Sequence, residues 1–505
     1  MQRLRTALKR AAVHPTTPFL ALVLVLSYFT YFHGYWQPNS LFWDENYHIA
    51  AAQKEIHGIF YMEPHPPLGK QLIALGEWLL HPNEASDQFL STDYGKNPPA
   101  GFSFAGYRLF PTLLAWLTAP LLFGVFLLMT GNRIFALFLS FLYIFDNAII
   151  VHSRSAMVDQ PLFFFGSAAI LLMLLLARER AGSRRFWVLA ALMGACLGAA
   201  AATKVNGLIL VLLVPYLLWI WRRHWRSIST FAIAAMVGFT LLYVGSWQTH
   251  FARGSTIDSH LPDQGYYKAS AAYKQIIQTG RTGNIAHFPV MLRDSLKFLP
   301  HYQRGVPKLD LCKSGENGSP FFLWPIGART IRYRWNHAGS DGAYRYLYLV
   351  PNPAGWALGL LGVILAVSIV LGSLLLPVTQ RPKELPLLLL FLAIYGGYMG
   401  AMARIDRVMY MYHYFLPLII SFLLFGLSIK AVTQLWNIRF TDSRKTVFLY
   451  ACGIVVFLGF QFMRPFTYYE PILNETFKSK QLLRLWDMNC INCQRDNPLV
   501  KKTCE

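Results

Sequence analysis

The sequence predicts an all-α protein that crosses a membrane many times. Of its 505 residues, 54% are hydrophobic and only 14% are charged, with a mean hydropathy of +0.35. A soluble domain carries about 25% charged residues. In addition, about eleven segments are apolar enough to span a bilayer, which takes roughly 20 residues per helix. Their expected ranges are 17–35, 108–130, 133–151, 160–177, 186–203, 206–221, 228–247, 354–377, 385–402, 414–431 and 446–463.

The basic residues indicate which ends of these helices face the cytoplasm. The first apolar segment follows a basic stretch and shows no small-residue cleavage site, so we expect an uncleaved signal anchor with a cytoplasmic N-terminus. Every later connection on that side is then rich in Lys and Arg, as in 178–185 and 222–226, which is the pattern of cytoplasmic loops. Topology thus explains the net charge of +21, and no nucleic-acid partner is expected.

This orientation leaves three large segments on the external side. We expect a transmembrane catalytic domain over 1–463, with external loops at 34–107 and 248–353, and an external tail over 464–505 that carries cysteines. The spacing of Cys490 and Cys493 favours a local structural disulfide, with pairing to Cys504 as an alternative and a redox or metal motif as a less favoured one. Cys312 is also external. No His/Asp cluster has the spacing of a metal site, so none is expected.

The first external loop holds the most informative residues. It begins with the sequence FWDENYH, which places Asp44 and Glu45 side by side near the membrane edge. Carboxylates there are costly unless they are paired or functional, although a solvated loop entrance is an equal alternative. The sequence EPHPPLGKQLIALG follows from Glu63, and its apolar part predicts a short helix lying in the membrane interface, with Lys70 near its start.

These two motifs together resemble the protein O-mannosyltransferases, the family 39 glycosyltransferases of the GT-C type. Glu63 stands where that family usually has Asp, which keeps the carboxylate. The resemblance continues along most of the chain, through GYRLFPTLLAWLTAPLL, FDNAIIVHSRSAMVDQPLFFF, ATKVNGL, GSPFFLWPIGARTIRYRW and RIDRVMYMYHYFLP. The residues that match family motifs there are Arg108, Asp146, Ser153, Arg154, Asp159, Lys204, Arg407, His413 and Tyr414.

The resemblance implies a GT-C fold whose external loops carry short interfacial helices. It also implies a mannosyl group transferred from a polyprenyl-phosphate donor to a Ser or Thr hydroxyl of a protein, with no cofactor. The second external loop is too short for the β-trefoil domains that eukaryotic members insert there. We therefore expect a bacterial inner-membrane enzyme with its active site and C-terminus in the periplasm.

The chemistry of this transfer assigns roles to the matching residues. The lipid phosphate leaves as an anion, so the enzyme needs a base for the acceptor hydroxyl and cations for the phosphate. Asp44 is the expected base, with Glu45 as the alternative or a hydrogen-bonding partner, and a single displacement would invert the anomeric configuration. Arg108 and Arg407 form the firmest expected phosphate pair. The full expected set for the donor phosphate or sugar is Glu63, His65, Lys70, Arg108, Arg154, Asp159, Lys204, Arg407, His413 and Tyr414.

Two other functions fit parts of the pattern. A lipid-linked-sugar transferase that acts on lipid A, a polysaccharide or another glycan would use similar loop motifs, and its acceptor would differ. A membrane transporter would show repeated halves and helices broken near the midplane, whereas the polar motifs here gather at one face. The donor lipid, an acceptor protein or glycan, and membrane lipid are therefore the expected partners.

Overall fold

The computed structural model describes residues 14–258, 263–313, 315–339, 342–377, 380–435 and 437–493. Within these ranges, eight helices are long and apolar enough to cross a membrane, or nine if the bent pair α6–α7 is one span. They are α5 (Ala105–Thr130), α8 (Asp159–Leu176), α9 (Arg184–Thr203), α11 (Trp225–Arg253), α15 (Pro353–Leu375), α16 (Leu385–Met402), the continuous pair η5 (Met411–Tyr414) and α17 (Phe415–Ala431), and α18 (Asp442–Thr467), beside α6 (Arg133–Ile144) and α7 (Asn147–Ser153).

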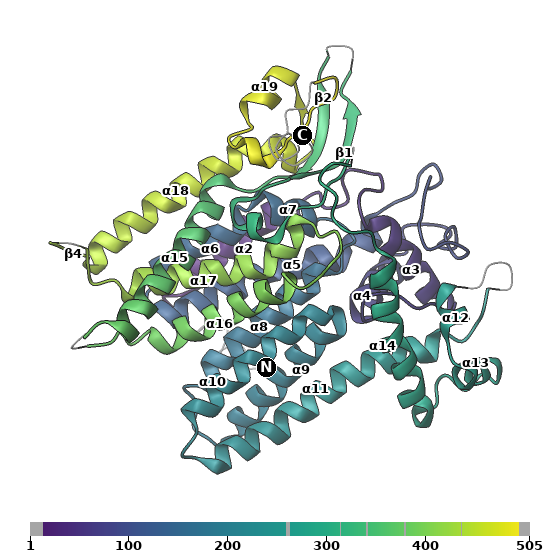
Figure 1. The fold of residues 1–505 in the computed structure, drawn as a ribbon, viewed down its shortest axis with the longest axis horizontal. Coiled ribbons are helices and arrows are strands. Elements are labelled where there is room, and N and C mark those ends of the chain that lie inside the picture. The colour runs from purple at the N-terminus through teal and green to yellow at the C-terminus, as the bar shows by residue number, and fades with distance from the viewer. Residues whose placement is uncertain are drawn as a thin grey trace.

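Two shorter apolar helices account for the remaining expected spans. The first is α2 (Thr17–Ser27) with its π-helical continuation η1 (Tyr28–Phe32), and the second is η2 (Val205–Leu212) with α10 (Leu213–Ile220). All eleven expected spans therefore correspond to helical segments, and the expected multi-span helical fold is confirmed. The central segment is Met411–Ala431, in which 89% of the residues of an 18-residue apolar stretch are buried inside the protein, and Figure 1 shows it among α5, α6, α15 and α16.

The break between α6 and α7 bends the chain by 61°, and polar side chains compensate for the lost helical hydrogen bonds. Asp146 caps α7 by accepting from the backbone N–H of Ile149 at 2.8 Å, and its other oxygen accepts from Trp356 Nε1 at 2.8 Å. Asn352 donates to the carbonyl of Phe145 at 2.8 Å. Backbone polar groups within a membrane need such partners, so Asp146 is a structural residue here.

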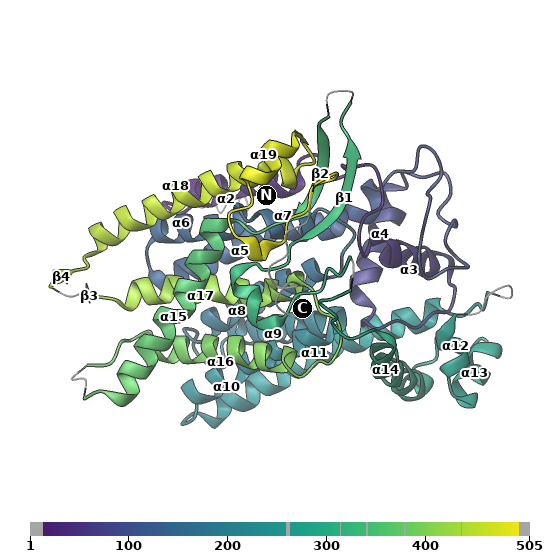
Figure 2. The same ribbon diagram turned by 45° about the horizontal axis from the view of Figure 1, so that its top comes forward.

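Short helices form the two long loops that the sequence places outside the membrane. The first loop carries α3 (Glu45–His57) and α4 (Leu68–Leu80), and the second carries α12 (Gln264–Lys268), α13 (Ala271–Gln278), η3 (Ile285–His287), α14 (Phe288–Gly305) and η4 (Phe321–Ile326). Helix α4 corresponds to the expected interfacial helix, with Leu75, Trp78 and Leu79 exposed. Figures 1 and 2 show α3, α4 and α12–α14 gathered at one end of the helical bundle.

A small sheet at this end was not expected from the sequence. Strands β1 (Ile331–His337) and β2 (Tyr344–Leu349) form an antiparallel hairpin, and β5 (Pro471–Ile472) pairs with β2 on its other side. A separate two-stranded ribbon, β3 (Gln434–Leu435) with β4 (Ile438–Arg439), lies at the opposite end of the bundle (Figure 2). The short strands are local exceptions within a helical fold.

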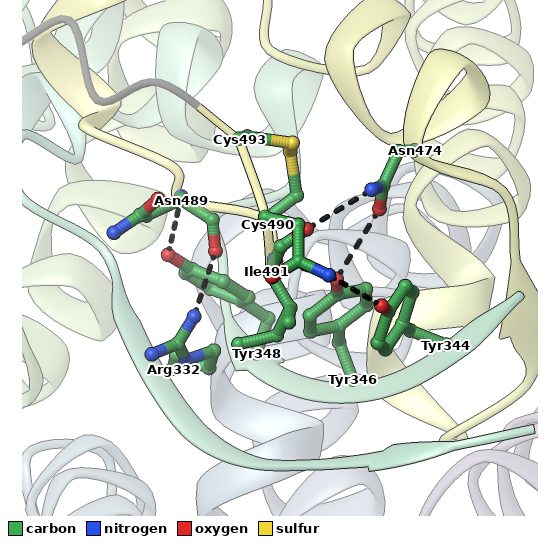
Figure 3. The surroundings of a disulfide bond; sticks show 10 residues. Arg332, Tyr344, Tyr346, Tyr348, Asn474, Asn489, Cys490, Ile491 and Cys493 are labelled. Atoms are coloured by element: carbon green, nitrogen blue, oxygen red, sulfur yellow. Dashed lines mark hydrogen bonds between the residues drawn. A yellow bond between two sulfur atoms is a disulfide. The ribbon is translucent and has the colours of Figure 1, made fainter. Parts of the chain in front are cut away.

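The tail, expected as a separate external segment, packs against this hairpin. It contains α19 (Asn474–Ser479), η6 (Arg484–Trp486) and the disulfide Cys490–Cys493, which is the local pairing expected; Cys504 lies outside the described residues. Alternate residues of β2 point to one face, where Tyr346 and Tyr348 accept from the backbone N–H groups of Ile491 and Asn489, both at 2.9 Å (Figure 3). The tail therefore forms one unit with the second external loop.

Candidate active site

A cavity opens among the external helices at the end of the bundle. It has a volume of about 220 Å³, and we call it the central cavity. The first loop, the ends of α8 and α9, the second loop and the segment before α17 all contribute to its wall. Of the residues expected at the site, the structure places these along it: Asp44, Glu63, His65, Asp159, Lys204, Arg407 and His413.

Asp44 lies at the start of α3, where the chain turns back from the first span. Its Oδ2 accepts a hydrogen bond of 3.0 Å from the hydroxyl of Tyr412. Burial raises the pKa of the Asp44 carboxyl, and the Tyr412 hydrogen bond and the charge of Lys204 oppose that rise. A carboxylate with a raised pKa that lines a cavity suits proton abstraction.

The residue before Asp44 has a strained backbone. Trp43 has a φ of +52°, a conformation that bulky residues rarely adopt. Its ring stacks on Tyr333 at 5.1 Å between centroids and meets Tyr410 edge-on at 5.2 Å. These aromatic contacts hold the strained turn, and such strain is common where a reactive side chain must be aimed.

A buried network holds the lysine of the central cavity. Lys204 ends α9 in an extended conformation, and its Nζ lies 2.7 Å from Asp159 Oδ1. The other oxygen of Asp159 lies 3.1 Å from His152 Nε2, and His152 Nδ1 lies 2.8 Å from the hydroxyl of Tyr333. His152 also stacks on Tyr412 at 4.9 Å. The network thereby ties the position of Lys204 to that of the residues around Asp44.

A largely apolar cavity continues from the central one. It has a volume of about 570 Å³ and is lined by apolar side chains of α14, α16 and η2, among them Leu296, Met402 and Ile209. The two cavities share Pro64, His65, Lys204, Gln303, Arg407 and His413. Two cationic side chains thus stand where a polar space meets an apolar one. Arg407 is held there by Gln303, whose Oε1 accepts from Arg407 Nε at 2.8 Å.

Two residues of the first loop lie beside the cavity with altered protonation. Burial and the charge of Lys204 lower the pKa of His65 to about 3, so its ring is neutral. Burial and the same lysine lower the pKa of Lys70 to about 7. Lys70 forms an ion pair with Glu63 and does not line the central cavity. Lys70 therefore contacts the residues of the cavity wall only through Glu63.

The structure places Arg108 and Glu45 away from the central cavity. Arg108 is fully buried, and its Nε and Nη2 donate to the two oxygens of Glu45 at 2.7 and 2.8 Å. Its remaining donors reach the carbonyls of Trp36, Pro38 and Ser40. With all its donors engaged, Arg108 joins α5 to the first loop and has none to offer a phosphate. Adjacent residues of a helix point in different directions, so the Glu45 side chain points toward Arg108 and away from the cavity that Asp44 lines.

Arg154 and Tyr414 are also placed elsewhere than expected. Arg154 donates to the carbonyls of Tyr31, His33 and Gly34 at 3.2, 2.8 and 2.7 Å, and so fixes the end of η1. Tyr414 is buried, with its hydroxyl 3.1 Å from that of Tyr395. Neither residue lines the central or the apolar cavity.

Comparison with known proteins identifies the family of this chain. The family model for dolichyl-phosphate-mannose-protein mannosyltransferase matches residues 21–254, and that for the C-terminal four-span region of protein O-mannosyltransferase matches residues 308–486. The chain belongs to the protein O-mannosyltransferase family.

Individual members of this family resemble the chain over different lengths. Protein O-mannosyl-transferase 2 of Danio rerio is 31% identical over 205 residues, which are 40% of this chain and 26% of that protein. The chain thus spans about a quarter of the length of such curated relatives. The polyprenol-phosphate-mannose–protein mannosyltransferase of Mycolicibacterium smegmatis is 22% identical over 501 residues, covering 88% of this chain and 87% of that one.

A solved structure confirms the GT-C fold of the family. The Saccharomyces cerevisiae protein O-mannosyltransferase Pmt1–Pmt2 complex, bound to the sugar donor, superimposes with a TM-score of 0.73 at 16% identity. The match covers 94% of this chain and 93% of that one. The multi-span helical architecture of this chain is therefore that of the family.

Two residues of the central network were missed by sequence reasoning. Tyr412 and His152 both lie inside motifs that match the family, in MYMYHY and VHSR. The sequence feature that could have identified them is their position next to residues predicted for the site, since Tyr412 precedes His413 and His152 lies two residues before Arg154. Nothing in the sequence distinguishes these aromatic residues from ordinary packing residues until the fold brings them to Asp44 and Asp159.

Proposed function

We propose that the chain transfers a mannosyl group from a polyprenyl-phosphate donor to a Ser or Thr hydroxyl of an acceptor protein, with Asp44 as the base. The observation that carries this proposal is the union of two cavities. Asp44 lines the polar one, Lys204 and Arg407 stand at the junction, and aliphatic side chains line the other. A sugar, a phosphate and an isoprenoid chain are joined in that same order in the donor.

The reaction then proceeds as a single displacement. Asp44 takes the proton of the acceptor hydroxyl, and the oxygen forms a bond to the anomeric carbon of the donor. The bond between that carbon and the phosphate oxygen breaks, and its electron pair leaves with the polyprenyl phosphate. Lys204 and Arg407 stabilise the charge that develops on this oxygen, as preorganised cations do in other transferases. The anomeric configuration inverts because attack and departure occur on opposite faces.

The relatives support mannose as the sugar and protein as the acceptor. The name of the M. smegmatis relative specifies polyprenol-phosphate-mannose and a protein acceptor, and that relative covers most of this chain. The remaining network residues fit the same reaction. Asp159 keeps Lys204 in place, and Glu63, His65 and His413 offer oxygen and nitrogen atoms to the sugar hydroxyls or the phosphate.

The proposed location is a bacterial inner membrane, with the site and the C-terminus on the periplasmic side. The multi-span architecture supports a membrane location of this kind. The distribution of charge supports the orientation, since the helix ends opposite the cavity carry clusters of Arg and Lys such as 178–185 and 222–226, and cytoplasmic loops are enriched in these residues.

The direct test of this function is transfer by the purified full chain. Polyprenyl-phosphate mannose and Thr-containing peptides are incubated with the wild type and with Asp44→Asn, and intact-mass analysis identifies the product. We expect peptide mannosylation in the wild type and a loss of about 100-fold or more in Asp44→Asn, the scale of general-base removal. Glu84→Gln, an exposed acid of the same loop that lies outside the cavity, is the matched control and should retain activity.

Two results would contradict the proposal. Retained transfer by Asp44→Asn would exclude this residue as the base. Mannose appearing on lipid A or on a polysaccharide from added envelope fractions, and on no peptide, would show that the acceptor is a glycan or lipid.

A further inference from the structure

A third cavity lies beside the central one, on the external face of the first loop. It has a volume of about 470 Å³, and we call it the outer cavity. Its lining carries two cationic side chains, Lys96 and Arg334, and the amides of Asn39, Asn46 and Asn97. No Asp or Glu is among the described residues that line it. The outer cavity is therefore a positively charged, amide-rich space.

A narrow ridge separates the outer cavity from the central one. Two segments form it, 44–47 and 93–97, and the backbone N–H of Gly95 joins them by donating to the carbonyl of Asn46 at 2.9 Å. Each segment faces both ways: Asp44 and Asp93 line the central cavity, whereas Asn46 and Lys96 line the outer one. The two cavities are thus neighbours through the segment that holds the proposed base.

The ridge carries a pair of exposed aromatic rings. Tyr47 and Tyr94 meet edge-on at 4.8 Å between centroids, and they are 38% and 37% exposed. Lys96 Nζ lies 5.2 Å from the centre of the Tyr94 ring, on the outer side. Rigid aromatic rings on a surface bind polypeptide at a low entropic cost, so the ridge offers a path between the two cavities.

Two residues that line the outer cavity each carry a buried polar atom with no hydrogen-bond partner among the described residues. The atoms are Arg334 Nε and Asn46 Oδ1. Arg334 is partly occupied, since its Nη1 donates to the carbonyl of Leu41 at 3.1 Å. It follows Tyr333 at a β-bulge in β1. A bulge changes the direction of neighbouring side chains, so the hairpin supplies Tyr333 to the central network and Arg334 to the outer cavity. Arg334 also hydrogen-bonds to Tyr469, so its contribution to the outer cavity is the positive charge that it places in the lining.

We infer that the outer cavity is a subsite for an acidic side chain, Asp or Glu, of the acceptor polypeptide. This inference rests on the proposed function, because it requires the acceptor hydroxyl to lie at Asp44. An extended chain advances about 3.3 Å per residue, so roughly two to four residues cross the ridge from the hydroxyl to the outer cavity. Lys96 and Arg334 then pair with the carboxylate, and the asparagine amides donate further hydrogen bonds.

Matched acceptor peptides test this subsite on the purified full chain. Each peptide contains a single Thr, and the members of a pair differ only by Glu or Gln at a position two to four residues from it, on either side. We expect the wild type to favour the Glu peptide by roughly three- to tenfold in kcat/KM at low ionic strength, through KM, since a partly exposed charge pair contributes modestly and is screened by salt. Lys96→Gln should reduce the preference, and Lys96→Gln with Arg334→Gln should abolish it.

The control and a second measurement keep the outcomes separate. Lys268→Gln, an exposed lysine of α12 outside the outer cavity, should leave the preference unchanged. Equal kcat/KM for Glu and Gln peptides, or a preference that survives in the double variant, would overturn the subsite while transfer itself upholds the proposed function. If Arg334→Gln folds poorly, the Lys96→Gln variant alone tests the subsite, because Lys96 is exposed and its replacement should not affect folding.

Binding without turnover distinguishes failure of the subsite from failure of the function. Fluorescence anisotropy measures labelled Glu and Gln peptides on Asp44→Asn protein. Tighter binding of the Glu peptide that weakens in Lys96→Gln supports carboxylate binding at the outer cavity, whereas a wild type that mannosylates no peptide counts against the proposed function. Equal binding of both peptides overturns the subsite.

Discussion

The ionisation of Asp44, the proposed base, depends on its neighbours. Burial alone would leave its carboxyl too readily protonated, and the hydroxyl of Tyr412 at 3.0 Å stabilises the ionised form. Lys204 adds a favourable charge, and Asp159 and His152 hold that lysine. The balance of these contributions sets the pH below which the Asp44 carboxylate becomes protonated and can no longer accept a proton.

Replacing Tyr412 by Phe should shift the acid side of the pH–rate profile. The folded pKa of Asp44 lies above the ordinary value, so activity should fall as the pH falls through that raised pKa. Removing a donor to the carboxylate raises the pKa further, and the acid limb of kcat/KM should move up by about one pH unit. The ring remains stacked on His152, so the protein should stay folded. An unshifted profile would show that Tyr412 does not control the ionisation of Asp44.

Glu45 should act on stability, in contrast to its neighbour. Glu45→Gln leaves Arg108 as a buried charge without its counter-ion, which typically costs about 3–5 kcal/mol. We expect a marked fall in thermal stability in detergent, measured by the fraction of protein that remains monodisperse after heating. Enzyme that remains folded should keep most of its kcat. A stable Glu45→Gln protein with no activity would show that Glu45 takes part in the reaction.

At the scale of elements, small residues allow the spans to approach closely. Gly194 and Gly198 of α9 face α11, and Gly238 of α11 faces Ala191 of α9 so closely that a side chain at Gly238 would meet its carbonyl. Small residues at such interfaces drive helix association in membranes. This contact matters for the site because α9 ends at Lys204.

Gly238→Leu should therefore separate α9 from α11 and displace Lys204. We expect poor expression or a reduced thermal stability, and a raised KM for the donor in any protein that folds. Gly245→Leu on the same helix is the matched control, since an added side chain there meets no atom within 4 Å. If the two variants behaved alike, close packing at Gly238 would not be what holds α9.

The sequence predicted the elements better than their contacts. Runs of about twenty apolar residues identified the spans, whereas the β1–β2 hairpin was missed because its strands are short and β2 pairs partly with the distant tail. Contacts between remote segments also decide which cationic side chains are available to a phosphate. Arg108 and Lys204 both lie at external helix ends, and only the fold shows that Glu45 and three carbonyls engage Arg108 fully.

At the scale of the whole molecule, the proposed function depends on the meeting of a polar cavity and an apolar cavity. The bundle supplies an apolar cavity between α14, α16 and η2, and the external loops supply a polar one that contains Asp44. Lys204 and Arg407 border both. The hairpin contacts the first loop through Tyr333, which stacks on Trp43. A lipid-linked substrate can thus keep its chain in apolar surroundings while its sugar reaches the base.

An experimental structure of the full chain with a bound polyprenyl phosphate would test this geometry most directly. We predict that the phosphate lies within hydrogen-bond distance of Lys204 and Arg407, with the isoprenoid chain along Leu296 and Met402. A phosphate bound at Arg108 or Arg154, or a lipid chain outside the apolar cavity, would contradict the account.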